Sequence, residues 1–226
     1  TAGVDCAPPA TAPAPAPARA PVRQAGPTPV ARAVLACTTR RLVLTDVVKR
    51  GSRVRITGVA DKRFVGRLVS LRFEADGRTA GRARVSPDGT FATTTPLPAK
   101  RLRSGNRARY QAVLGTEKSL NLKLERRMYV DRLTSEGAKV TVVGRVTRPL
   151  GTPRQTITLT RRVSCTRSEV VTRFKPKADG RFSVTVDAPV GQAAAVYRLG
   201  TKVRKTKTNR KLFPTFTLPR GVNLAQ

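Results

Sequence analysis

The sequence contains no histidine and no tryptophan, and aromatic residues make up only 4% of its 226 residues. The absence of histidine excludes a Ser-His-Asp triad, a Cys-His dyad and any zinc site that uses imidazole. Acidic residues are also scarce, with 13 Asp and Glu against 45 Lys and Arg, so the chain has few carboxylates for acid–base pairs or a calcium cage. No apolar run approaches the roughly 20 residues that a transmembrane helix needs.

The motifs of common enzyme classes are absent as well. The chain has no Gly-x-Ser-x-Gly, no Ser-x-x-Lys, no Gly-x-Gly-x-x-Gly and no P-loop. We therefore expect a protein that is not an enzyme, with no catalytic residues, no cofactor and no metal site.

The basic residues give a formal net charge of +32. A charge of this size favours an acidic partner, such as nucleic acid, an anionic cell-wall polymer, an acidic polysaccharide or a membrane surface. A genome rich in G and C also over-supplies Arg, Ala and Pro, but that bias would not by itself remove Asp and Glu. A functional and a compositional origin of the charge both stay open.

Residues 1–37 form a segment rich in Pro and Ala, including the run Thr11–Pro17. Proline fixes φ and lacks an N–H, and alanine offers little apolar surface, so we expect this segment to be extended and disordered. It is typical of a stalk in an exported bacterial protein whose signal peptide has been removed. The alternative is a plain linker to another domain.

From residue 38 onward, apolar and polar residues alternate in short runs, which predicts half-buried β-strands. The clearest runs are 53–57, 82–85, 119–124, 155–160 and 181–186. Turn sequences such as Asp-Gly separate the runs, and no segment predicts a helix.

The pattern occurs twice. Gly58 and Gly144, Asp88-Gly89 and Asp179-Gly180, and Tyr110 and Tyr197 correspond in order, at offsets of about 85–90 residues. We expect an all-β fold of two tandem antiparallel sandwiches, one over residues 38–127 and one over residues 128–226, after the disordered segment 1–37. Each tyrosine is expected to have a buried ring and a hydroxyl bonded to backbone, as in a tyrosine corner.

This repeat resembles bacterial immunoglobulin-like and carboxypeptidase-regulatory-like (prealbumin-like) sandwich modules. Their pattern is Gly-x-Val, then Asp-Gly-x-Phe, then a late Tyr. Gly144-Arg145-Val146 fits the first element directly, whereas Gly58-Val59-Ala60 departs from it. The resemblance covers about residues 40–220 and implies an immunoglobulin-like fold, but no substrate.

The three cysteines, Cys6, Cys37 and Cys165, have no metal-binding spacing. In an exported chain two of them would be oxidised. We expect a Cys37–Cys165 disulfide that joins the two repeats and fixes the angle between them. Cys6 would then stay a free thiol or form a disulfide with another chain. Three free thiols in a reducing compartment are the alternative.

One basic segment stands out because it has no counterpart in the first repeat. The stretch from Tyr197 to Phe216 is seven residues longer than that from Tyr110 to Leu122, and its loop, 200–211, contains no acid. We expect a basic hairpin that binds polyanions with little specificity. The candidate residues are Lys202, Arg204, Lys205, Lys207, Arg210 and Lys211.

Together these features predict an exported, non-catalytic protein of the cell envelope or extracellular space that acts as a structural, adhesion or polyanion-contact module. Its partner would be an anionic cell-wall polymer or an acidic polysaccharide. An intracellular nucleic-acid-binding protein is the second interpretation, which the scarcity of aromatic residues for base stacking disfavours. The third is a pair of accessory domains from a larger secreted protein.

Overall fold

The structure, a computed structural model, describes residues 28–224. The predictions for residues 1–27, including most of the expected stalk and Cys6, lie outside the described residues.

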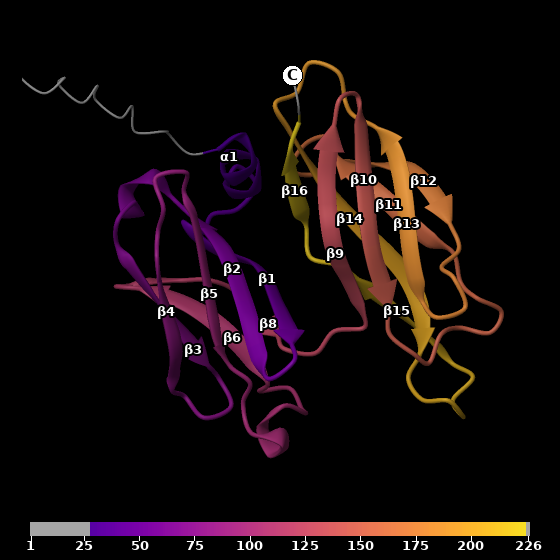
Figure 1. The fold of residues 1–226 in the computed structure, drawn as a ribbon, viewed down its shortest axis with the longest axis horizontal. Helices are drawn as coiled ribbons and strands as arrows, with labels where there is room; N and C mark the ends of the chain where they lie inside the picture. The colour runs from indigo at the N-terminus through magenta and orange to yellow at the C-terminus, as the bar shows by residue number, and fades with distance from the viewer. Residues whose placement is uncertain (1–27, 225–226) are drawn as a thin grey trace, which may run out of the picture.

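The strands form two antiparallel β-sandwiches side by side (Figure 1), which confirms the prediction of an all-β fold with two tandem sandwiches. The strands of the first sandwich are β1 (Leu42–Arg50), β2 (Arg53–Ala60), β3 (Leu68–Phe73), β4 (Thr79–Arg84), β5 (Thr90–Pro96), β6 (Arg109–Leu114), β7 (Glu117–Lys118) and β8 (Leu122–Lys123). The strands of the second are β9 (Met128–Glu136), β10 (Lys139–Val146), β11 (Ile157–Arg162), β12 (Ser168–Phe174), β13 (Arg181–Asp187), β14 (Ala194–Arg204), β15 (Leu212–Phe216) and β16 (Arg220–Asn223).

The two sandwiches share one topology. In the first, β1-β2-β5 faces β4-β3-β6-β7, with β8 also paired to β6. In the second, β9-β10-β13 faces β12-β11-β14-β15, with β16 also paired to β14. This division of strands between two sheets is the immunoglobulin-like sandwich architecture. Two short 3-10 helices, η1 (Lys62–Phe64) and η2 (Lys100–Leu102), lie in loops of the first sandwich.

The alternating sequence pattern places apolar residues between the sheets and cations outside. In β2, Val54 and Ile56 are fully buried whereas Arg53 and Arg55 are exposed. Each sandwich has its own cluster of buried apolar residues. The charge of the strands is therefore carried on outer faces, where it also protects sheet edges from aggregation.

The repeated glycine makes room for the repeated phenylalanine. Gly58 pairs with Phe91 across β2 and β5, and a Cβ at Gly58 would lie 2.1 Å from the Phe91 ring. Gly144 pairs with Phe182 in the same way, at 2.5 Å. Both rings are buried, so the Gly and the Asp-Gly-x-Phe elements of the repeat are two halves of one packing contact.

The tyrosine-corner prediction is wrong in its hydrogen bond. The rings of Tyr110 and Tyr197 are buried as expected, but within residues 28–224 neither hydroxyl has a hydrogen-bond partner. Burial raises the pKa of both phenols, because the phenolate would lose its hydration, and the charge of Arg161 partly offsets this rise in pKa at Tyr197.

The sequence predicted one strand over residues 119–124, but only Leu122–Lys123 (β8) is strand. A buried hydroxyl takes part in the pairing just before this strand, and the second sandwich has the same feature. The Ala112 N–H donates to Ser119 Oγ at 2.9 Å, and the Ser119 N–H donates to the Ala112 carbonyl at 2.9 Å. Thr217 makes the same pair of bonds with Leu199 in the second sandwich, at 3.0 and 2.9 Å. In both sandwiches the hydroxyl oxygen takes the place of a backbone carbonyl in one hydrogen bond between the strands.

Residues 29–35, predicted to be part of the extended segment 1–37, form the helix α1 (Pro29–Leu35). The Thr28 hydroxyl caps its first turn by accepting a hydrogen bond from the Ala31 N–H, and Pro29 occupies a first-turn position that needs no donor. Ala31 and Val34 are buried in a cluster with Val59 and Val196, one from each sandwich. The helix therefore packs between the two sandwiches at one end (Figure 1), against β2 on one side and β14 and β16 on the other. This tertiary burial stabilises a segment too short to be helical alone.

A buried acid also joins the sandwiches. Asp46 of β1 forms ion pairs with Arg126, in the connection between them, and with Arg220 of β16. It also accepts a hydrogen bond from the Val47 N–H at 2.9 Å. All three charged side chains are mostly buried, so this contact fixes the relative position of the two domains.

Candidate functional site

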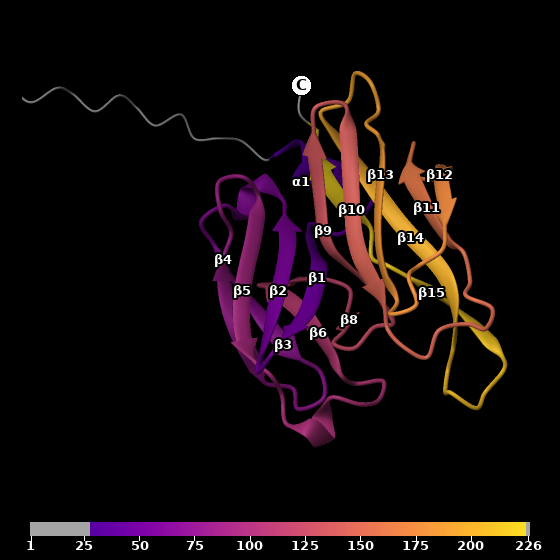
Figure 2. The same ribbon diagram turned by 45° about the vertical axis from the view of Figure 1, so that its right-hand side comes forward.

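The predicted basic segment forms a β-hairpin at one end of the second sandwich. Strand β14 runs to Arg204, so residues 200–204 of the predicted loop are strand, and residues 205–211 connect it to β15. Among the predicted site residues, Arg204 is half-buried and the other five are exposed: Lys202, Lys205, Lys207, Arg210 and Lys211. We call residues 202–211 the basic hairpin; it extends past the end of the sandwich (Figure 2).

The insertion that forms the hairpin is longer than the sequence predicted. The register pairs Tyr110 with Leu122 but Tyr197 with Arg220, rather than with a residue near Phe216. The first pair is 12 positions apart and the second 23, so the insertion is eleven residues and not seven. The extra residues lengthen β14 beyond β6 and form the connection 205–211.

Short polar contacts shape the tip of the hairpin. The Asn209 N–H donates to Thr206 Oγ1 at 3.0 Å, and the Lys211 N–H donates to Asn209 Oδ1 at 2.9 Å. These side-chain bonds replace the ladder bonds that the loop lacks. The Lys211 ammonium lies 5.7 Å from the Phe213 ring centroid. The loop therefore has a defined shape and presents its remaining lysines to solvent.

Arg204 positions the hairpin. Its guanidinium donates to the Asn209 carbonyl at 3.0 Å and to Thr152 Oγ1 at 3.2 Å. Its own carbonyl accepts a bond from Arg127 at 3.0 Å. Burial lowers the pKa of Arg127 from its usual value, because the charged guanidinium loses hydration. Arg204 thus differs from the other five predicted cations, whose side chains project outward.

The fold adds four exposed cations that the sequence analysis did not select. Two neighbouring loops lie at the same end of the sandwich, because Arg154 donates to the Pro176 carbonyl at 3.1 Å and Arg148 to the Ala178 carbonyl at 3.1 Å. The Thr152 contact links these loops to the hairpin. The added cations are Arg148, Arg154, Lys175 and Lys177. They come from separate segments, so no local charge run in the sequence marks them.

Acids contribute little to this end of the molecule. No Asp or Glu follows Asp187 in the sequence. Asp179, in the neighbouring loop, already pairs with Arg181 at 3.7 Å. The basic hairpin and its neighbours therefore form a strongly positive surface, in which Asp179 is already paired, and such a surface attracts anions.

The predicted disulfide is confirmed and ties α1 to the second sandwich. Cys37 and Cys165 are bonded, with their Cα atoms 5.0 Å apart and a sequence separation of 128. Beside the disulfide, Arg162 donates to the Ala33 carbonyl at 3.1 Å. Together with the Asp46 ion pairs, the disulfide restrains the angle between the sandwiches.

In residues 28–224, no group of three or more His, Cys, Asp or Glu side chains is arranged to hold a metal ion. The same part of the chain contains no helix with the length and apolar character to cross a membrane.

No family model matches the chain, and no curated protein matches it. Among solved structures, the chicken interferon gamma receptor alpha chain is 10% identical, with a TM-score of 0.31, over 84% of this chain and 100% of the receptor chain. The Escherichia coli alpha-2-macroglobulin activated by porcine elastase is 14% identical, with a TM-score of 0.25, over 81% of this chain and 20% of that one. Similarity at this level carries no conclusion about function.

Proposed function

We propose that this chain is a non-catalytic module of an exported protein and that its basic hairpin contacts an acidic polymer of the cell envelope or the extracellular space. The observation that carries the proposal is the set of five exposed cations in a shaped, acid-free hairpin that the otherwise equivalent first sandwich lacks. An ammonium or guanidinium that projects into solvent attracts phosphate, sulfate or carboxylate without demanding one geometry. The module would be similar to bacterial immunoglobulin-like domains that act as spacers or in adhesion.

The disulfide supports export. Structural disulfides persist in oxidising compartments and are rare in the cytosol. The bond joins the segment that follows α1 to a loop of the second sandwich, 128 positions later in the sequence. A protein that depends on this bond for its domain arrangement suits an extracellular location.

The test uses a labelled polyanion, dextran sulfate, and two variants that each remove four positive charges. The hairpin variant changes exposed cations to serine but keeps Arg204, which positions the loop: Lys205, Lys207, Arg210 and Lys211. The control variant changes exposed arginines on the outer faces of the two sheets of the first sandwich to serine: Arg53, Arg55, Arg72 and Arg82. Affinity is measured by fluorescence anisotropy across a salt series.

We expect the hairpin variant to bind about tenfold or more weakly at low salt and to show a smaller dependence of log affinity on log salt, because fewer counterions are released. The control variant should change both quantities much less. Equal losses in the two variants would show that net charge alone governs binding and would overturn the proposal. Tighter binding of a DNA duplex than of dextran sulfate at physiological salt would favour the nucleic-acid interpretation instead.

A further inference from the structure

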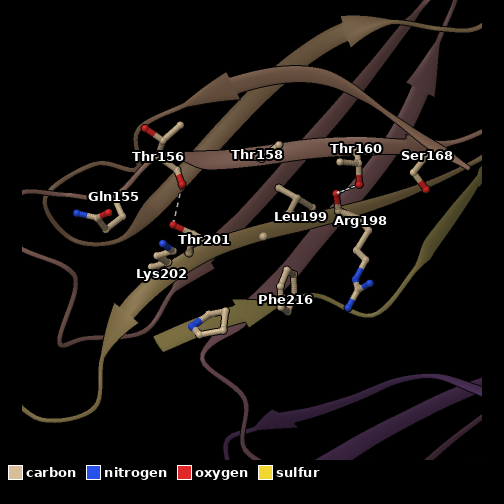
Figure 3. Close-up of a pocket in the computed structure, with 12 residues that line it drawn as sticks. Gln155, Thr156, Thr158, Thr160, Ser168, Arg198, Leu199, Thr201, Lys202 and Phe216 are labelled. Carbon is tan, nitrogen blue, oxygen red and sulfur yellow. Dashed lines mark hydrogen bonds between the residues drawn. The ribbon is translucent and has the colours of Figure 1, made fainter. Parts of the chain in front are cut away.

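The outer face of the sheet β12-β11-β14-β15 has a hollow of about 530 Å³ next to the basic hairpin (Figure 3). We call it the Phe216 groove. No acidic side chain lines it. The lining residues used below are Thr156, Thr158, Thr160, Arg198, Lys202 and Phe216.

Phe216 is the exposed aromatic ring of this protein. It is 51% exposed, whereas the other nine phenylalanine and tyrosine side chains, all within the described residues, are buried or half-buried. The ring lies over Gly200, its partner in β14, where a Cβ would come within 2.8 Å of the ring. The Arg198 guanidinium carbon lies 4.6 Å from the ring centroid. A single exposed apolar side chain is common on protein surfaces, but this ring borders a hollow lined by cations and hydroxyls. That combination points to a ligand that covers the ring.

Polar and positive groups surround the ring in a regular pattern. Arg198 and Lys202 lie on either side of Gly200 on the outer face of β14. They are four residues apart, about 13 Å along the strand, so a ligand that contacts both must be longer than one sugar ring. Across the groove, three threonines alternate along β11 and the residue before it (Figure 3).

The strands beneath the groove are fixed by side-chain bonds. Thr160 Oγ1 donates to the Arg198 carbonyl at 3.1 Å, and Thr201 Oγ1 donates to the Thr156 carbonyl at 2.8 Å (Figure 3). These contacts supplement the ladder between β11 and β14. The groove is therefore part of a rigid sheet face, which lowers the entropic cost of binding.

The first sandwich lacks this site, although its sheet has the same topology. There, Val113 takes the position of Gly200, since it pairs with Ser70 as Gly200 pairs with Thr158. Lys118 pairs with Val113, where Phe216 pairs with Gly200. The groove and the basic hairpin are thus specific to the same sandwich.

We infer that the Phe216 groove binds an extended acidic polysaccharide built from uronic-acid sugars. This inference rests on the proposed polyanion contact and assigns its chemical class. The C–H face of a sugar packs against the part of the Phe216 ring that Gly200 and Arg198 leave exposed. Arg198 and Lys202 attract carboxylates on successive sugars, and the threonine hydroxyls exchange hydrogen bonds with sugar hydroxyls. The chain then continues onto the basic hairpin.

The groove suits a polysaccharide better than a single-stranded nucleic acid. Sequence-tolerant nucleic-acid grooves stack successive bases on several aromatic side chains. Here one ring is exposed, and the groove around it is lined by several hydroxyl side chains and two cations. A single ring with a hydroxyl-rich wall matches a ligand whose units carry one apolar face and many hydroxyls.

The test compares an oligogalacturonate, a neutral maltodextrin and an oligothymidylate as probes, by isothermal titration calorimetry at physiological salt. Phe216→Ala removes the ring, and Phe216→Tyr restores it. Leu68→Ala is the matched control, because Leu68 is 48% exposed on β3 of the first sandwich. The hairpin variant described above leaves every residue of the groove unchanged.

We expect the wild-type protein to bind oligogalacturonate but not maltodextrin. Phe216→Ala should weaken this binding by about tenfold, while Phe216→Tyr and Leu68→Ala should stay within about twofold of the wild type. Thermal unfolding should confirm that Phe216→Ala remains folded, since the ring is half exposed. If Phe216→Tyr keeps its affinity for oligogalacturonate and Phe216→Ala loses it, the effect comes from the surface of the aromatic ring.

Three outcomes would overturn the inference. Unchanged oligogalacturonate binding in Phe216→Ala, with dextran sulfate binding lost in the hairpin variant, would reject the groove and leave the proposed function standing. An equal or larger loss of oligothymidylate binding in Phe216→Ala would assign the groove to nucleic acid. A wild-type protein that binds neither dextran sulfate nor oligogalacturonate would reject both the groove and the proposed function.

Discussion

The Asp46→Asn substitution measures how strongly the two sandwiches are held together. Asp46 is 11% exposed at its side chain, and its partners Arg126 and Arg220 are 14% and 26% exposed. Arg126 also donates to the Val47 carbonyl at 2.8 Å. Asparagine keeps the shape of the side chain and an acceptor for the Val47 N–H, but it removes the negative charge between two guanidinium groups.

The expected loss in the free energy of unfolding follows from that burial. Removing one partner of a buried ion pair costs about 3–5 kcal/mol, because the remaining charge is left without compensation. Arg220 is partly hydrated and can regain water, so we expect a loss near the lower end, about 3 kcal/mol. The double variant with Arg220→Gln leaves less uncompensated charge, and its loss should be smaller than the sum of the single losses by about 1 kcal/mol or more.

The assay is urea unfolding followed by circular dichroism, with the disulfide intact in every sample. Asp187→Asn is the control, since Asp187 pairs with Lys139 at 2.6 Å but both side chains are more than half exposed. That variant should lose about 0.5 kcal/mol or less. An Asp46→Asn loss no larger than that of Asp187→Asn would refute the conclusion that Asp46 joins the domains. Strictly additive losses with Arg220→Gln would show that the two residues act independently.

Three further predictions concern the covalent link, the buried phenols and the repeated glycine. Reduction of the Cys37–Cys165 disulfide should lower the free energy of unfolding by up to about 5 kcal/mol, the chain-entropy value for a loop of this length, as measured by urea unfolding with and without dithiothreitol; an unchanged midpoint would contradict it. The raised pKa of Tyr197 means that the folded protein keeps this proton to a higher pH than the unfolded chain, so the associated stability is present below about pH 10 and is lost as pH rises through the folded pKa. Tyr197→Phe should reduce this alkaline loss, and at neutral pH it should be neutral or stabilising because the hydroxyl has no partner within the described residues; a clear destabilisation at pH 7 would show that the hydroxyl is bonded. Gly144→Ala should cost about 1–3 kcal/mol, because the new Cβ would meet the Tyr129 carbonyl oxygen at 2.3 Å and the Phe182 ring at 2.5 Å. Gly191→Ala, whose Cβ meets no atom within 4 Å but whose φ is positive, measures the effect of backbone strain without the packing clash in the same thermal unfolding assay.

The sequence predicted much of the fold because its information is local. Alternation of apolar and charged residues along β2 and β13 determines which side chains face the core. The Asp-Gly turns are equally local, and Gly89 and Gly180 have the positive φ angles, 79° and 87°, that the turn prediction required. The repeat of these signals predicted two sandwiches of one topology.

Local patterns failed where distant residues decide the structure. The helix α1 was missed because its proline and alanines resemble the preceding segment, and only burial of Ala31 against both sandwiches makes it stable. The length of the hairpin insertion depended on which residue pairs with Tyr197, a question of register across the sheet. The same limit applies to the candidate site, because the loops that carry Arg148 and Lys175 are linked to the basic hairpin through the contact between Thr152 and Arg204.

By itself, the sequence determined the strand pattern, the duplicated sandwich and the acid-free basic segment, since each depends on residues close together in the chain. Only the tertiary structure decided that Asp46 meets two arginines from other segments and that Phe216 lies exposed over Gly200 between Arg198 and Lys202. The physical reason is that a pleated sheet places alternate residues of neighbouring strands side by side. A surface built in this way draws each residue from a different strand, and no window of sequence contains it.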